Sequence, residues 1–89
     1  MRIVLSPELI NDLKKIKQKN TKLSERIQKQ LYLFSTNPKH PSLRTHKLNA
    51  KMSNLWSIST TMSVRMVYKL LSEDRAYFVK IGTHQEVYD

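Results

Sequence analysis

The apolar positions of this chain follow two periods, a helical one in its first half and a strand alternation in its second. A spacing of three or four residues defines two stripes of apolar side chains. The stripes are Leu9, Ile10, Leu13 and Ile16, followed by Leu23, Ile27, Leu31 and Phe34. Asn20-Thr21 interrupts the pattern and Asn37-Pro38 ends it. The pattern therefore predicts two helices, over residues 7–17 and 21–35.

Alternating apolar and polar residues predict strands on both sides of this helical part. Arg2–Leu5 reads as a first strand, with Ser6 as the N-cap of the helix that follows. Further strands are predicted over residues 56–60, 64–70 and 76–81, the last ended by Gly82, and residues 43–48 are expected to add a short one. The order β-α-α-β-β-β-β predicts one α+β domain over residues 1–89, with an N-terminal strand, a helical hairpin and a four-stranded antiparallel sheet region.

Charge adds a class of partner to this picture, since the chain carries a net charge of +9. Such an excess attracts a polyanion or an acidic protein. Lys14 and Lys15 on the first helix either bind RNA or form a solubilising face. The chain has no cysteine, and no segment is apolar enough for a signal peptide or a membrane span. We expect a cytoplasmic protein that does not act at a membrane.

Four side chains in the second half could handle a phosphodiester: His46, Arg65, His84 and Tyr88. Arg65 alternates with Val64 and Met66, so it is expected to point away from the core, where a guanidinium can hold a phosphate or merely cover apolar surface. His84 follows the last strand, in a loop, as a general acid or base or as an incidental histidine. Tyr88 could stack on a base or pack on the sheet edge.

His46 lies in the basic segment Leu43–Leu48, which also contains Arg44 and Lys47. If this segment lies beside Arg65, the two imidazoles can bracket one phosphate. One would remove the 2′-hydroxyl proton of RNA and the other would protonate the leaving 5′-oxygen, which is a metal-free transesterification without a cofactor. Arg44, Lys47 and Lys51 are then candidates for binding the RNA backbone, together with the lysines of the first helix.

Four segments in this order resemble the RelE/ParE superfamily of type II toxin–antitoxin toxins, nearest its RelE, YoeB and YafQ branches. They are LRTHKL at 43–48, LWSI at 55–58, VRMVY at 64–68 and IGTHQEVY at 81–88. The resemblance implies a helical hairpin packed on a twisted antiparallel sheet. It also implies an mRNA interferase that cleaves mRNA in the ribosomal A site, contacts ribosomal RNA and forms a heteromer with an acidic antitoxin.

The resemblance also implies roles for individual residues. Arg65 matches the phosphate-binding strand arginine, His84 matches the C-terminal histidine of the YoeB and YafQ branches, and Tyr88 lies near the terminal aromatic residue. His46 resembles the histidine that precedes Lys-Leu in YafQ-like members, and is the leading candidate for the general base, with Lys47 or Lys51 as electrostatic substitutes.

The chain departs from these branches at several positions. Ser57 and Ser59 stand where RelE-like members have lysines, Thr60 or Thr61 and Ser63 stand where YafQ-like members have His and Asp, and no glutamate before Leu43 matches that of YoeB. Two other functions are therefore kept. One is a ParE-like toxin that inhibits DNA gyrase without catalysis, and the other is a catalytically weak relic that binds only an antitoxin or RNA.

Overall fold

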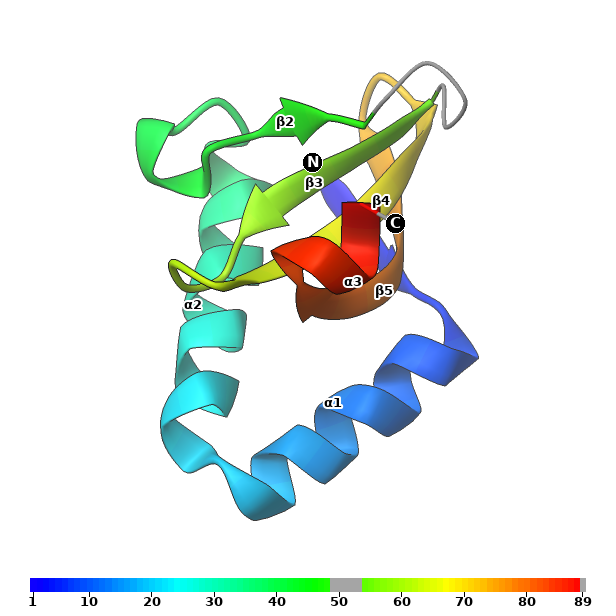
Figure 1. The fold of residues 1–89 in the computed structure, drawn as a ribbon. Coiled ribbons are helices and arrows are strands. Elements are labelled where there is room, and N and C mark those ends of the chain that lie inside the picture. Colours follow the sequence, from blue (N-terminus) through cyan, green and yellow to red (C-terminus); the bar gives the residue numbers. More distant parts are fainter. Residues whose placement is uncertain (49–53, 89) are drawn as a thin grey trace.

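The computed structural model describes residues 1–48 and 54–88, and it confirms the α+β class and the predicted order of strands and helices. The elements are β1 (Arg2–Leu5), α1 (Pro7–Lys19), α2 (Thr21–Thr36), the 3-10 helix η1 (Pro41–Leu43), β2 (His46–Lys47), β3 (Leu55–Ser59), β4 (Val64–Ser72), β5 (Arg75–Thr83) and α3 (His84–Tyr88). In Figure 1, α3 lies in front of the sheet and the upper part of α2 lies behind it.

The strands form one five-stranded sheet in the order β1-β5-β4-β3-β2. The pairs β2–β3, β3–β4 and β4–β5 are antiparallel, as predicted. β1 instead runs parallel to β5, with Arg2 opposite Arg75 and Leu5 opposite Phe78. The N-terminal strand is therefore an edge of the same sheet, which is mixed rather than wholly antiparallel.

Side-chain caps define the helical hairpin that connects β1 to the rest of the sheet. The Ser6 hydroxyl accepts a hydrogen bond from the Leu9 backbone N–H at 3.0 Å, which confirms the predicted N-cap of α1. Asn20 acts on both helices: its N–H donates to the Ile16 carbonyl, and its side chain accepts from the N–H of Leu23 at 3.1 Å. One residue thus ends α1 and starts α2, which forces a sharp turn between them.

The face of the sheet turned toward α1 and α2, called the helix face here, is apolar. Ile58, Met66, Tyr68 and Phe78 are buried there beneath the two helices. Phe34 of α2 packs its ring against Tyr68 and Phe78, with centroid distances of 4.9 and 5.3 Å. Burial of these aromatic side chains supplies a large part of the driving force for folding.

Two polar side chains of α2 hold the end of β3. Gln30 is only 1% exposed, and its Nε2 donates to the backbone carbonyl of Ser59 at 2.8 Å. Arg26 donates through Nε to the carbonyl of Thr60 at 2.9 Å. These bonds give the carbonyls at the end of β3 a partner in α2 and so connect the sheet to that helix.

The opposite face of the sheet, called the α3 face here, has a much smaller apolar cluster. Val87 of α3 is buried against Val67 of β4 and Leu48, with Leu55 and Val79 packed around them. Arg65 shares this face, because strand residues alternate and Val67 follows two positions later. The α3 face is therefore apolar at its centre and polar around it.

Three sequence predictions were wrong in their bounds. β5 continues through Gly82 to Thr83, residues 43–48 form only the two-residue strand β2 after η1, and His84 begins a helix instead of lying in a loop. The sequence Thr83-His84-Gln85-Glu86 explains the helix, since threonine followed three residues later by glutamate is a helix-capping pattern. Within the described ranges, no helix is both long and apolar enough to cross a membrane.

Candidate active site

Arg65 is half-buried on the α3 face, and hydrogen bonds fix its guanidinium. Its Nε donates to the Ser57 hydroxyl at 2.9 Å, and its Nη2 donates to the backbone carbonyls of Ser57 and Arg44. Arg44 directly follows η1 and has a left-handed backbone, with φ 45° and ψ 50°. A hydroxyl and two carbonyls therefore orient the guanidinium without neutralising its charge, which suits it to hold an anion.

His46 lies on the α3 face beside the residue that holds Arg65. In β2 it is paired in register with Ser57 of β3. Directly opposed residues of an antiparallel pair point to the same face, with Cβ atoms about 5 Å apart. The His46 side chain is exposed. The structure thus places His46 one strand away from the Ser57–Arg65 hydrogen bond.

His84 is the first residue of α3 and is exposed. It comes two residues after Gly82, which is the partner of Arg65 in the β4–β5 register. Val87, one turn later in α3, packs on Val67 of the α3 face. Two histidines and an arginine that are far apart in the sequence therefore share one face of the sheet.

Lys80 and Ser57 are two further polar residues of this face that sequence reasoning did not assign to the site. Lys80 is paired with Val67 in the β4–β5 register, and its Nζ donates to the backbone carbonyl of Glu86 at 2.9 Å. In the sequence, Ser57 departs from the lysine pattern of RelE-like members. In the structure its hydroxyl is one of the three acceptors that orient Arg65.

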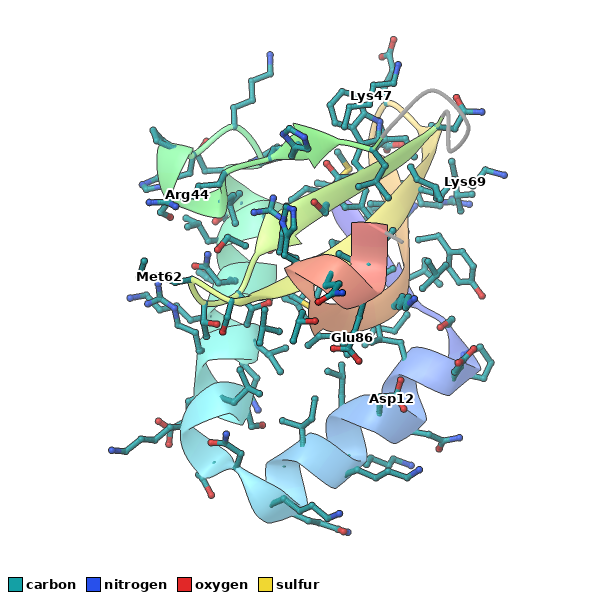
Figure 2. All side chains as sticks on the ribbon, viewed as in Figure 1. Asp12, Arg44, Lys47, Met62, Lys69 and Glu86 are labelled. Atoms are coloured by element: carbon teal, nitrogen blue, oxygen red, sulfur yellow. The ribbon has the colours of Figure 1, made fainter. Side chains whose placement is uncertain are left out.

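The remaining predicted residues have different positions. Lys47 is paired with Trp56 of β3, and its Nζ lies 5.8 Å from the centroid of the Trp56 ring. Because neighbouring strand residues alternate, the Lys47 side chain is on the opposite face of the sheet from that of His46. Figure 2 shows Arg44 and Lys47 well apart along this edge. Lys14 and Lys15 are exposed on α1, which covers the helix face rather than the α3 face. Lys51 and the Tyr88 side chain lie outside the described residues.

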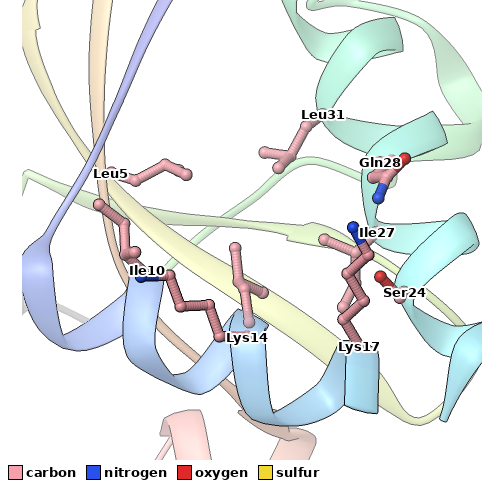
Figure 3. A pocket seen from close by; sticks show the side chains of 9 residues that line it. Leu5, Ile10, Lys14, Lys17, Ser24, Ile27, Gln28 and Leu31 are labelled. Carbon is pink, nitrogen blue, oxygen red and sulfur yellow. The ribbon is translucent and has the colours of Figure 1, made fainter.

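A separate surface feature lies between α1, α2 and β1, where apolar side chains line a groove of about 280 Å³ (Figure 3). Leu5, Ile10, Leu13, Ile27 and Leu31 provide its apolar walls. Two lysines of α1, Lys14 and Lys17, also line it. The groove therefore combines apolar walls with positive charge. It is on the helical side of the molecule, away from Arg65.

Comparison with known proteins relates this fold to bacterial toxins. A structure described as a YoeB/ParE toxin from Agrobacterium tumefaciens superposes with a TM-score of 0.78 at 20% identity, covering 94% of this chain and 99% of the other. YafQ from E. coli gives a TM-score of 0.77 at 21% identity over 100% of both chains. At such identities the likeness shows the fold alone.

The heterotetrameric YoeB–YefM toxin–antitoxin complex from Staphylococcus aureus gives a TM-score of 0.76 at 20% identity, covering 94% of this chain and 97% of the other. No curated protein matches the sequence. The family model described as "ParE toxin of type II toxin-antitoxin system, parDE" matches residues 3–88, nearly the whole chain. The chain therefore belongs to the ParE toxin family of type II toxin–antitoxin systems.

Proposed function

We propose that this toxin is an endoribonuclease that cleaves mRNA on the ribosome. The observation that carries the proposal is the shared α3 face of Arg65, His46 and His84, with the Arg65 guanidinium oriented by Ser57 and the Arg44 carbonyl. A toxin that only binds a protein needs no such combination of two imidazoles around a fixed cation. The resemblance to the RelE, YoeB and YafQ branches points to the same activity.

In the proposed reaction, Arg65 binds the scissile phosphate and stabilises the charge that develops on its oxygens. His46 accepts the proton of the adjacent 2′-hydroxyl, and the 2′-oxygen forms a bond to phosphorus. The bond from phosphorus to the 5′-oxygen breaks, and His84 donates a proton to that leaving oxygen. The products are a 2′,3′-cyclic phosphate and a free 5′-hydroxyl, and the two histidines have exchanged protonation states.

Further basic residues of the chain are proposed to bind RNA. Lys14 and Lys15 on α1, together with Arg44, Lys47 and Lys51, would contact the phosphates of mRNA or ribosomal RNA. Their attraction is electrostatic and decreases with salt. This reading places the toxin in the cytoplasm, where ribosomes translate mRNA.

The direct test is primer extension on mRNA from a purified translation reaction containing the wild-type toxin, His84→Ala or Arg65→Ala. We expect discrete cuts within translated codons for the wild type and at least a 100-fold loss for either variant, since each role is worth about 10² or more in rate. The matched control is His40→Asn, because His40 caps η1 and asparagine keeps a capping acceptor. It should cut like the wild type.

A second candidate is a non-catalytic inhibitor of DNA gyrase, favoured by the match to the ParE family model. It predicts arrested replication with intact mRNA, and full toxicity of both His84→Ala and Arg65→Ala. That result would replace the ribonuclease proposal.

The partner that we propose is an acidic antitoxin, as expected from the positive charge of the chain. The groove between α1 and α2 suits an amphipathic acidic segment of such a protein. Its apolar walls would bury the apolar side of the segment, and Lys14 and Lys17 would attract the carboxylates. The similar YoeB–YefM structure is itself a toxin–antitoxin complex, which supports this class of partner.

A further inference from the structure

The helix that carries His84 is too short to be stable by itself. α3 has five residues, whereas isolated helices of fewer than about 12 residues are marginal in water. The orientation of His84 therefore depends on the contacts that hold α3 to β5 and to the sheet. Glu86 takes part in most of the contacts that the structure shows.

The first contact is a reciprocal cap at the junction of strand and helix. The Thr83 backbone N–H donates to Glu86 Oε1 at 2.8 Å, and the Glu86 N–H donates to the Thr83 hydroxyl at 3.3 Å. Thr83 is the last residue of β5 and His84 the first of α3, so no linker separates them. The cap thereby fixes the backbone on both sides of His84.

The second contact is close packing of Glu86 over Gly82. A Cβ atom at residue 82 would lie 3.1 Å from the Cβ of Glu86 and 3.3 Å from its Oε1. Contacts this short require a neighbour to move. Gly82 is the partner of Arg65 in the sheet, and it is the single glycine of the chain. Figure 2 shows Glu86 beneath α3, near the end of β5.

The other end of α3 is held by Lys80 and Val87. Lys80 donates to the carbonyl of Glu86, where a cation is favourable because helix carbonyls lack partners at the C-terminal end. Val87 is 4% exposed against Val67 and Leu48. Four contacts thus converge on residues 86 and 87, namely the cap, the packing over Gly82, the Lys80 hydrogen bond and the burial of Val87.

We propose that Glu86 is a positioning residue that, through Thr83 and over Gly82, holds α3 so that His84 faces the phosphate bound by Arg65. This inference rests on the proposed ribonuclease function. Glu86 acts through the backbone and is not itself the general base. The hydrogen bonds of Thr83, that of its backbone N–H above all, lower the pKa of the Glu86 carboxyl, which makes it a weaker base.

The test compares Glu86→Ala, Glu86→Gln and Gly82→Ala in single-turnover cleavage of ribosome-bound mRNA over a range of toxin concentrations. Glu86→Ala should lower the maximal rate at least ten-fold with less than a two-fold change in the half-saturating concentration, because misplacing a catalytic group affects reaction more than binding. Glu86→Gln should keep at least half of the rate, since glutamine serves equally as the acceptor in this cap. Gly82→Ala should resemble Glu86→Ala.

Two results would overturn the inference while the ribonuclease function stands. One is wild-type cleavage by Glu86→Ala. The other is a loss in Glu86→Gln as large as in Glu86→Ala, which would mean that the carboxylate charge, and not the cap, matters.

Hydrogen exchange measured by NMR separates this inference from the proposed function. In Glu86→Ala, the amides of residue 86, which donates to the Thr83 hydroxyl, and of residue 87 in the same turn should lose protection at least ten-fold, while that of Phe78 in β5 should not change. If the wild type does not cleave mRNA, the ribonuclease proposal fails. Unchanged protection at residues 86 and 87 would then also reject Glu86 as the residue that holds α3.

Discussion

The two faces of the sheet use the same strands for different purposes. On the helix face, Met66 and Tyr68 of β4 join an apolar core under two helices. On the α3 face, Arg65 and Val67 of the same strand share a face with exposed histidines and with a small apolar cluster. Adjacent residues of one strand thus contribute to stability and to the candidate site. Substitutions one position apart in β4 should therefore have separable effects on stability and on activity.

The largest expected effect is on the helix face. Phe34→Ala removes a ring that is 1% exposed and packs on two other aromatic rings. It should lower the free energy of unfolding by about 3–5 kcal/mol, a large share of the stability of a small domain. Urea unfolding followed by circular dichroism measures this. Tyr32→Ala on the same helix, where the side chain is 71% exposed, should change the stability by less than about 0.5 kcal/mol.

A smaller effect, on activity rather than stability, is expected on the α3 face. Ser57→Ala removes the hydroxyl that accepts from Arg65 Nε, so the guanidinium loses one of its orienting bonds. The rate of mRNA cleavage should fall about ten-fold, which corresponds to about 1.4 kcal/mol. Ser59→Ala on the same strand is the matched control, because its hydroxyl donates to the Thr61 carbonyl instead. Equal rates for both variants would show that Ser57 does not position Arg65.

The smallest effect concerns the one ionisable ring of the aromatic core. Burial raises the pKa of Tyr68 from 10.0 to about 12. Between these values the unfolded chain loses the phenol proton while the folded protein keeps it. This contribution to stability is therefore complete below pH 10 and is lost as the pH rises toward 12. Urea unfolding at pH 9 and pH 11 should show a smaller loss in Tyr68→Phe than in the wild type, whereas equal losses would contradict the assignment.

The sequence allowed the helices, the strands and the face of Arg65 to be predicted, because each depends on local periodicity or a local cap. It did not reveal Lys80. Strict alternation from Phe78 would turn Lys80 toward the helix face, but the register shift after Val67 in the β4–β5 pairing turns it to the α3 face. A bulge of this kind depends on the partner strand, so alternation within β5 alone cannot indicate it.

The site could be predicted only in part, because some of its contacts, like the bulge, depend on the tertiary structure. The exposure of Arg65 followed from alternation, but its bond to the Arg44 carbonyl joins residues from different parts of the fold. α3 is too short to show a helical period, although Thr83 and Glu86 carried the capping pattern that marks its start. The roles of Arg65 and His84 in cleavage remain predictions that the variants above test, and the role of His46 as the general base remains a prediction.

The parallel pairing of β1 with β5 has a consequence for biosynthesis. The first strand of the chain can join the sheet only after β5 has been made, since Arg2–Leu5 pairs with residues 75–78. Such distant pairing has to close a long loop before it gains stability. The nascent chain therefore cannot complete its sheet until β5 has been synthesised, and β1 stays unpaired while the helical hairpin and strands β2 to β4 are made.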